Sequence, residues 1–396
     1  MTAIDVVGGI YRERCAFPYW NELYGSAGRA AKALSGLGPQ VRLHSALSQR
    51  ERIVADASFG GAGISLHLSD RGSPIEFEYL HSLAVPTILP LHGIGVQGLP
   101  DVVGDVAIKF GMLDADPKVT AEIAVYDPQS AFQPRPFGAS GLKAKRLAVI
   151  ANRGEMLKLA RASSLEEAVR SVLASEGAEV VVVKDGIDGA IVYDRDGAQR
   201  VPAYKTKNVF SLGSGDVFVA AFCYAWAICG DAAANAAEFA SQSTANYVET
   251  RTLPIAPPSA SNVKLRDAVT KAGGKIYLAA PFREAGQRML LDDARSQLQH
   301  LGMQVFSPIH DIGPGSAELV VQQDLAAIRQ CDAVFAILNG SSPGTVFEVG
   351  YARALDKPVF CVTQNMRDVD LKLPTGAGAH LHEDYVSALF QIAWRS

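Results

Sequence analysis

The sequence predicts two α/β domains in one chain, and three observations lead to this expectation. The chain has 396 residues, more than one hydrophobic core usually organises. A segment rich in proline and serine, residues 253–273, separates a longer N-terminal part from a shorter C-terminal part. Expected strands and helices alternate in both parts. We therefore expect domains at residues 1–252 and 274–396, with 253–273 as their linker.

The composition is that of an ordinary globular protein. Apolar residues make up 48% of the chain and charged residues 20%, which permits sizeable cores. The net charge is −4, and no basic cluster is longer than the group Lys143, Lys145 and Arg146. Polymeric nucleic acid is therefore not an expected partner.

Cysteine usage and hydrophobicity indicate a cytoplasmic protein. The five cysteines are scattered, without the spacing of a metal site or the density of a disulfide scaffold, so we expect reduced and mostly buried thiols. The N-terminus lacks the pattern of a signal peptide, and no apolar stretch reaches membrane-spanning length. No membrane partner is expected.

In the N-terminal part, hydrophobic periodicity and caps indicate several separate elements. The expected strands are 4–7, 147–150 and 180–183, the expected helices are 28–37, 164–176 and 216–228, and a hairpin is expected around 185–186. Residues 50–100 are rich in glycine and short strands, and their order alone assigns no topology.

In the C-terminal part, strands and helices follow one another with short connections. We expect strands at 275–279, 303–306, 333–338 and 359–362, and helices at 284–301, 317–331 and 346–355. This order predicts a parallel sheet with helices on both faces. Ligands bind such sheets beyond the carboxyl ends of the strands.

Two acidic residues are candidates for chemistry in this part. Glu348 lies among small and apolar residues in the first turn of an expected helix, whose dipole would keep the carboxylate ionised and nucleophilic. Alternatively, Glu348 only balances that dipole. Asp324 has helical spacing with Val321 and Ile328, which indicates a core-facing carboxylate. Alternatively, it is a cap or an ion-pair partner.

Three segments together resemble the nucleoside 2-deoxyribosyltransferase family and the related nucleotide N-glycosidases. They read I-Y-L-A-A-P-F from residue 276, D-L-A-A-I-R-Q-C-D-A-V-F-A-I-L from 324 and G-T-V-F-E-V-G-Y-A from 344. The resemblance implies a small flavodoxin/Rossmann-like fold. It also implies that Glu348 attacks the anomeric carbon, Asp324 contacts the sugar or protonates the departing base, and Tyr277 orients Glu348.

Two further residues bear on the substrate that this resemblance implies. Transferases of the family have an aspartate for the 5′-hydroxyl about six residues before the nucleophile, where this chain has Ser342. The family's monophosphate hydrolases have serine there, and Arg283 would be a second phosphate ligand. We therefore favour a nucleoside 5′-monophosphate, although Ser342 before Pro343 is equally typical of a turn.

The N-terminal part contains a glycine-rich helix start. Leu212-Gly213-Ser214-Gly215-Asp216 precedes an apolar helix, so backbone N–H groups would meet a phosphate and Asp216 would take a proton from an attacking hydroxyl. Alternatively, these residues are only a glycine-rich cap.

The setting of this helix start resembles the PfkB or ribokinase family over nearly all of residues 1–250. Asn152-Arg153-Gly154-Glu155 follows a strand, and Lys184-Asp185-Gly186-Ile187-Asp188-Gly189 is an expected hairpin. The resemblance implies a ribokinase-like α/β fold, with ATP and Mg²⁺ as cofactors. The implied anion hole is Gly213, Ser214 and Gly215, and the implied base is Asp216. Asn152 and Glu155 would organise Mg²⁺ and the phosphates, with Glu155 as the metal-binding residue. Gly186 and Gly189 would face the nucleotide.

The chain departs from that family at three places. Phe210 stands where an aspartate is usual, the sugar-binding aspartate appears at best as Glu13, and the early G-G-N helix start lacks its asparagine. We therefore expect a bifunctional enzyme that processes nucleosides or nucleotides and phosphorylates a sugar or nucleoside with ATP. The alternative is a nucleotide-sensing regulatory protein with a degenerate kinase fold. A homo-oligomer is expected, because sites in such families are often completed by a neighbouring subunit.

Overall fold

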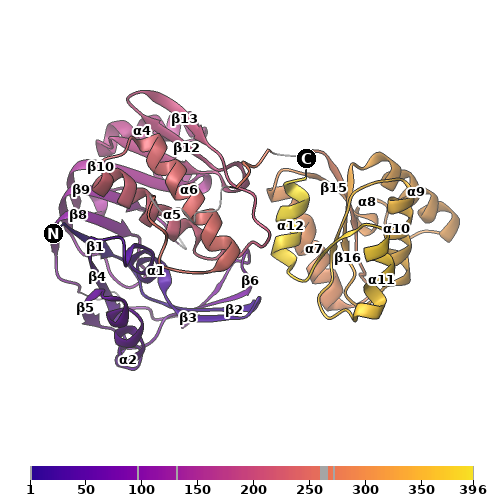
Figure 1. Cartoon of the computed structure of the whole chain (residues 1–396), viewed down its shortest axis with the longest axis horizontal. Helices are drawn as coiled ribbons and strands as arrows, with labels where there is room; N and C mark the ends of the chain where they lie inside the picture. Colours follow the sequence, from indigo (N-terminus) through magenta and orange to yellow (C-terminus); the bar gives the residue numbers. More distant parts are fainter. Residues whose placement is uncertain (1, 96–97, 131–132, 259–265, 271–272, 396) are drawn as a thin grey trace. The chain divides into compact units, whose positions relative to one another are not determined.

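The computed structural model describes residues 2–95, 98–130, 133–258, 266–270 and 273–395. Backbone contacts divide the chain into two compact units (Figure 1). Unit 1 comprises Met1–Thr206 and Phe210–Val269, and unit 2 comprises Lys207–Val209 and Thr270–Ser396. Each unit has its own sheet and its own hydrophobic core.

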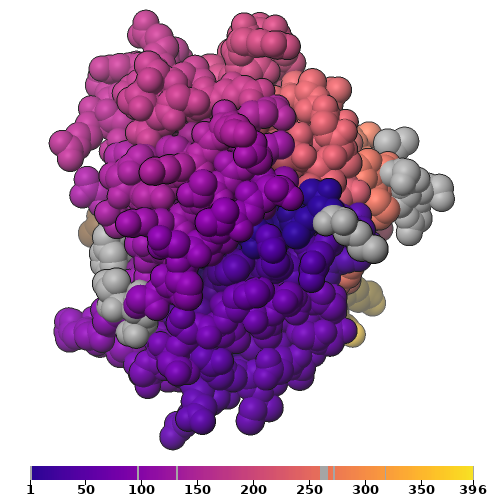
Figure 2. Space-filling model, turned by 90° about the vertical axis from the view of Figure 1, so that its left-hand side faces the viewer, coloured from indigo at the N-terminus to yellow at the C-terminus, as the bar shows by residue number. Residues whose placement is uncertain are grey.

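A nine-stranded sheet forms the centre of unit 1. Its spatial order is β13 (Gly197–Val201), β12 (Ala190–Asp194), β11 (Val180–Lys184), β10 (Leu142–Asn152), β9 (Val119–Asp127), β8 (Val102–Phe110), β1 (Ala3–Val7), β4 (Gln40–Leu47) and β5 (Ser65–Asp70). The strands from β11 to β5 are parallel, and β12 and β13 are antiparallel additions at one edge. In Figure 2 the violet part of the surface lies at the bottom, the magenta and salmon parts of later residues lie at the top, and the indigo of the first residues is seen between them.

Helices cover both faces of this sheet. One core joins the sheet to α1 (Gly25–Leu34), α5 (Ser214–Cys223) and α6 (Ala233–Thr250). The other joins it to α3 (Arg153–Ala160) and α4 (Leu165–Glu176). Because both faces are covered, central strands such as β11 are continuous β-branched runs, not alternating patterns.

A second, four-stranded sheet in unit 1 has the order β3 (Trp20–Leu23), β2 (Arg12–Phe17), β6 (Glu76–His81) and β7 (Thr87–Leu89). We call it the lid sheet. Together with the helix α2 (Gln49–Ser58), it accounts for much of the region whose topology the sequence left unassigned. The hairpins β2–β3 and β6–β7 are antiparallel, whereas β2 and β6 pair in parallel.

Unit 2 has the parallel sheet that its sequence predicts. The strand order is β15 (Gln304–Phe306), β14 (Lys275–Ala279), β16 (Ala333–Ile337), β17 (Val359–Val362) and β18 (His380–His382), and every pair is parallel. The helices α7 (Ala285–His300) and α12 (Tyr385–Ala393) pack together, as do α9 (Ala317–Gln330) and α10 (Pro343–Ala354). The short helices α8 (Pro308–Asp311) and α11 (Asp368–Gly376) complete the unit.

Two details of unit 2 differ from the expectation. The helix α10 begins at Pro343 and not at residue 346, because a proline at the first helical position has a backbone angle already suited to the helix. Glu348 therefore lies beyond the first turn. Val321 is 43% exposed, so the core-facing stripe of α9 begins later, at Ala327 and Ile328.

The described parts of the expected linker pack against unit 1. Ile255 is buried in its core and donates its backbone N–H to Ala33 O. Val269 N donates to Ala203 O on the other side of the gap. Residues 259–265 and 271–272 of this segment lie outside the described residues. Across the described ranges, no helix combines the length and apolar character needed to cross a membrane.

Candidate active sites

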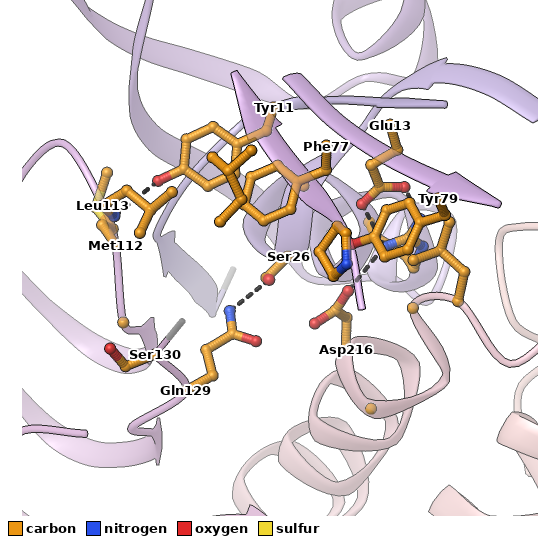
Figure 3. A pocket seen from close by; sticks show the side chains of 18 of the residues that line it. Tyr11, Glu13, Ser26, Phe77, Tyr79, Met112, Leu113, Gln129, Ser130 and Asp216 are labelled. Carbon is orange, nitrogen blue, oxygen red and sulfur yellow. Dashed lines mark hydrogen bonds and ion pairs between the residues drawn. The ribbon is translucent and has the colours of Figure 1, made fainter. Parts of the chain in front are cut away.

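Unit 1 contains a cavity of about 550 Å³ between the lid sheet and the carboxyl ends of the core strands. Figure 3 shows Tyr11, Phe77 and Tyr79 in a row on the lid side, with Ser26, Gln129 and Asp216 below them. The cavity thus has an apolar aromatic wall and a polar floor. This is the edge at which parallel sheets bind their ligands.

The start of α5 forms part of the floor. Gly213 has φ +77° and precedes the helix, so its left-handed conformation turns the chain into α5 without the cost that a side chain would bring. Gly213, Gly215 and Asp216 line the cavity, and Asp216 lies in the first turn. Ser214 begins the helix and donates its own N–H to Ser211 O at 3.1 Å, so the N–H groups that follow it in the first turn are where an anion would be stabilised.

A buried arginine connects the floor to the lid sheet. Arg29 of α1 is 1% exposed and donates to Asp216 Oδ2 at 2.8 Å and to Tyr247 Oη at 3.0 Å. It also donates to both carboxylate oxygens of Glu13 on β2, at 3.0 Å for Oε1. The guanidinium packs against Gly213, where a Cβ atom would lie 2.1 Å from Arg29 Cζ. Burial raises the pKa of Glu13, and the Arg29 charge offsets part of this shift.

Asn152 and Glu155 line the same cavity and form a capping box at the start of α3. Glu155 N donates to Asn152 Oδ1 at 2.8 Å, and Asn152 N donates to Glu155 Oε2 at 3.0 Å. Lys184 also lines the cavity and donates to the buried Asp127 Oδ2 at 2.8 Å. Burial raises the pKa of Asp127 to about 6, although Lys184 lowers it.

The carboxylates of this cavity could bind a magnesium ion only if a bound phosphate and water supplied its remaining ligands. Within the described residues, no group of three or more His, Cys, Asp or Glu side chains could hold a metal alone. Mg²⁺ commonly takes one or two protein carboxylates and completes its shell with phosphate oxygens and water. Glu155, in a cavity that also holds an anion-stabilising helix start, is consistent with that arrangement.

The hairpin glycines lie apart from the described cavity lining. Gly186 (φ +58°) and Gly189 (φ +84°) both have positive φ angles in the turn between β11 and β12. Gly189 is required sterically, because a Cβ atom there would lie 2.0 Å from Val201 O. Phe210, the departure from the family pattern, is buried and packs against Trp20, with ring centroids 5.1 Å apart.

Unit 2 has a smaller cavity of about 210 Å³, and it brings the predicted catalytic pair together. Asp324 of α9 and Glu348 of α10 both line it. Tyr277 of β14 is fully buried beneath them and donates its hydroxyl to Glu348 Oε1 at 2.6 Å. Asp324 Oδ1 is buried and has no hydrogen-bond partner among the described residues. An unpaired buried acceptor beside a cavity is a place where a ligand donor is stabilising.

Burial controls the charge of this pair. It raises the pKa of Glu348 to about 7, against the lowering effect of the Tyr277 hydroxyl, and the neighbouring Asp324 raises it further. The pKa of Asp324 is also raised by burial. The expectation that a helix dipole keeps Glu348 fully ionised is therefore wrong. Glu348 is not in the first turn, and desolvation outweighs any dipole contact.

The structure separates the two residues predicted to bind a phosphate. Ser342 lines the unit 2 cavity at the N-cap of α10, where its side chain makes no capping hydrogen bond. Arg283 is exposed and is not part of the described cavity lining. Phe282 beside it does line the cavity.

Sequence reasoning missed three residues at or behind the unit 1 floor. Arg29, Asp127 and Lys184 lie far apart in the sequence, and their pairing depends on the fold. One signal was present for Arg29, a lone arginine in a helix otherwise made of small residues, one lysine and one leucine. Such a residue is unexpected on a buried helix face unless it is paired.

Comparison with known families agrees with this division. Residues 276–386 match the family model described as nucleoside 2-deoxyribosyltransferase, and residues 139–256 match that of the pfkB family carbohydrate kinases. The chain therefore joins two family segments. Both predicted resemblances are confirmed, together with the ribokinase-like α/β fold and the separate smaller parallel-sheet domain.

Curated relatives match one part of the chain. A 5-dehydro-2-deoxygluconokinase of Bacillus velezensis is 34% identical over 112 residues, which is 28% of this chain and 33% of that protein. One of Bacillus subtilis is 31% identical over 102 residues, which is 26% of this chain and 31% of that protein. The chain thus spans about a third of the length of the curated relatives it matches.

Among solved structures, a fructokinase from Vibrio cholerae with fructose, ADP and calcium is similar, with a TM-score of 0.49 and 14% identity. The similarity covers 63% of this chain and 94% of the fructokinase. A pyrophosphate-dependent kinase in the ribokinase family has a TM-score of 0.45 and 13% identity, with 62% and 94% coverage.

Proposed function

We propose that unit 2 cleaves N-glycosidic bonds of nucleosides or their 5′-monophosphates, with Glu348 as the nucleophile. The observation that carries the proposal is one cavity in which Glu348 and Asp324 meet above the Tyr277 hydroxyl. A retaining displacement needs one carboxylate to form a glycosyl ester and one acid to assist the leaving group. The match of this segment to the deoxyribosyltransferase model supports the same chemistry.

Tyr277, Glu348 and Asp324 would have separate roles in this reaction. Tyr277 holds Glu348 Oε1, which leaves Oε2 to attack the anomeric carbon. As the C–O bond forms, the C–N bond breaks, its electron pair goes to the base, and protonated Asp324 supplies the proton. Burial favours the protonated form of Asp324, as this role requires. Water or a second base then resolves the ester, with the Asp324 carboxylate accepting a proton.

Base release is the test of this function. Purified protein is incubated with nucleosides and with their 5′-monophosphates, each with and without a second base, and free bases are separated by chromatography. We expect release that Glu348→Gln removes, and a glycosyl adduct on Glu348 when a 2′-deoxy substrate is rapidly quenched and mapped by mass spectrometry. An adduct on Asp324, or full release by Glu348→Gln, would refute the assignment.

Ser342 supports a monophosphate as the substrate, because its hydroxyl, which makes no capping hydrogen bond, lies at a helix start in the same cavity. Ser342→Asp should therefore weaken cleavage of monophosphates and spare nucleosides, because a carboxylate repels the phosphate dianion. Undiminished cleavage of monophosphates by this variant would remove Ser342 from the phosphate site. The expected homo-oligomer is tested on the same preparation by light scattering.

For unit 1 we propose ATP-dependent phosphorylation of a sugar or nucleoside hydroxyl. The specific observation is that Gly213, Gly215 and Asp216 share one cavity with Asn152 and Glu155. The helix start would stabilise the transferred phosphoryl group, Glu155 would hold Mg²⁺, and Asp216 would accept the hydroxyl proton. Mg²⁺ would supply charge neutralisation at the phosphates. The match to the pfkB carbohydrate kinase model and to relatives named as kinases supports phosphoryl transfer.

The kinase proposal is tested by ATP turnover with a panel of sugars and nucleosides. We expect Asp216→Asn to lower turnover by about 10²–10⁴, as general-base removal does, while ATP binding persists. Asp231→Asn, at an exposed aspartate of the same unit, is the matched control. Unchanged turnover in Asp216→Asn would contradict the role of this residue. No turnover by the wild type with any acceptor would favour the alternative, a nucleotide-sensing regulatory protein.

A further inference from the structure

The part of the unit 1 cavity lined by Glu13, Arg29 and Asp216 is where the proposed acceptor hydroxyl must lie, because Asp216 is the proposed base. We call it the acceptor end. Its cation, Arg29, donates from all three guanidinium nitrogens to protein acceptors. With 1% of Arg29 exposed, this guanidinium has no surface left for a ligand.

The other cation in the described cavity lining, Lys184, lies in a different part of the cavity. Lys184 Nζ lies 3.2 Å from where a Cβ atom of Gly215 would be, which puts it beside the helix start proposed to hold phosphate. It is also paired with Asp127, behind the cavity surface. Lys184 interacts electrostatically with Asp216 as well, but because it is already paired with Asp127 it does not neutralise the acceptor end.

Carboxylates outnumber cations at the acceptor end. Glu13 and Asp216 share the single guanidinium of Arg29. A substrate carboxylate placed here would be a third negative group in a desolvated space, and like charges repel strongly where water is excluded. Hydroxyl groups would be favoured, because Asp216 Oδ2 already accepts from Arg29, and Asp216 Oδ1 can accept an O–H.

The remaining walls suit an uncharged molecule as well. Figure 3 shows Tyr11, Phe77 and Tyr79 side by side on the lid, and the Tyr11 and Phe77 rings stack with centroids 5.3 Å apart. Aromatic faces pack well against the C–H face of a sugar or the ring of a base. Ser26 and Gln129, which are hydrogen-bonded to each other, add neutral polar groups on the floor.

We propose that the acceptor end selects uncharged hydroxyl compounds over acids of the same shape, and that Glu13 sets this selectivity by occupying Arg29. The inference rests on the proposed kinase function in one respect, because that function identifies the bound molecule as the phosphate acceptor. The selectivity itself is a property of binding. Glu13→Gln can keep one of the two hydrogen bonds from Arg29, through its amide oxygen, and removes one negative charge, so it should admit an acid.

Binding is measured by calorimetry without ATP, on pairs that differ in one group: alditols and aldonic acids, and nucleosides and their 5′-carboxylates. In the wild type we expect the uncharged member of at least one pair to bind about tenfold more tightly, and Glu13→Gln to reduce that ratio about tenfold. Glu22→Gln, at an exposed glutamate on the adjacent lid strand β3, should leave the ratio unchanged. If Glu13→Gln does not fold, Asp216→Asn removes one charge from the same group and should shift the ratio in the same direction.

Tighter binding of the acid by the wild type would overturn the proposal. An unchanged ratio in a folded Glu13→Gln, or no binding of any uncharged member, would also overturn it. If the uncharged member binds selectively but no compound is phosphorylated in the ATP assay, the result contradicts the kinase function and still supports the selectivity. The two failures are therefore distinguishable.

Discussion

Glu348 is a carboxyl group whose burial opposes the charge that its proposed reaction requires. Its pKa is raised to about 7 in the folded chain, from an ordinary value of 4.5. The folded state therefore holds the proton more tightly than the unfolded state, and this stabilisation is lost as pH rises from 4.5 through 7. The shift corresponds to a cost on the order of 3 kcal/mol for the ionised form.

This gives a stability prediction for Glu348→Gln. The variant should lose base release yet melt at a higher temperature than the wild type at pH 8, with the difference shrinking at pH 5, because the amide never ionises. Glu383→Gln, at an exposed glutamate of unit 2, should show no such pH dependence. Scanning calorimetry at both pH values checks the prediction, and a lower melting temperature at pH 8 would contradict it.

The Tyr277 hydroxyl should set the pH at which unit 2 works. Its hydrogen bond to Glu348 favours the carboxylate and lowers the pKa of that group. Tyr277→Phe should therefore shift the ascending limb of the pH–rate profile to higher pH, besides lowering kcat. The measurement is kcat/KM for base release between pH 5 and 9. A limb that stays in place would mean that Tyr277 does not act through the charge of Glu348.

At the scale of elements, the start of α5 depends on the absence of one side chain. Gly213→Ala would place a Cβ atom 2.1 Å from Arg29 Cζ, so the guanidinium must move from Asp216 and Glu13. Gly230 offers a matched control, since it has φ +78° and open space where a Cβ would lie. Gly230→Ala should cost only the left-handed conformation, roughly 1–2 kcal/mol.

We therefore expect Gly213→Ala to lose both stability and phosphorylation, and Gly230→Ala to keep phosphorylation. Chemical denaturation and ATP turnover measure the two effects. Equal destabilisation by both substitutions would show that the packing of Arg29 on Gly213 contributes little.

The elements that the sequence predicted well are those with strong local signals. The strands Lys275–Ala279 and Val359–Val362 are apolar runs between polar segments, and their bounds agree with the structure. The lid sheet could not be predicted, because its short strands are half exposed and pair across distant segments. The expected start of α10, residue 346, is too late, because the apolar pattern does not reveal that Pro343 is already the first helical residue.

The same reasoning explains which site residues were found. Glu348, Asp324 and Asp216 stand in local motifs, so sequence spacing sufficed to select them. Glu13 was selected by its place after the first strand, but its pairing with Arg29 joins a lid strand to helix α1, and no local pattern reveals an ion pair of that kind. Arg283 was selected by its position after a strand, but the structure leaves its side chain exposed.

At the scale of the whole molecule, each unit has its own core and its own cavity. We therefore expect the two proposed activities to be separable in the full chain. Glu348→Gln should leave phosphorylation unchanged, and Asp216→Asn should leave base release unchanged, each measured with saturating substrate. Loss of base release in Asp216→Asn would instead support a regulatory role for unit 1.

The pairing of Glu13 with Arg29 has a kinetic consequence. Glu13 belongs to a strand of the lid sheet, whereas Arg29 and Asp216 belong to helices of the core. If the lid sheet moves away at this point, the buried Glu13–Arg29 ion pair must break. Breaking an ion pair where water is excluded is unfavourable, so this movement should be slow. Residence time in the cavity should therefore be governed by this contact, so that Glu13→Gln speeds the exchange of bound molecules in stopped-flow measurements.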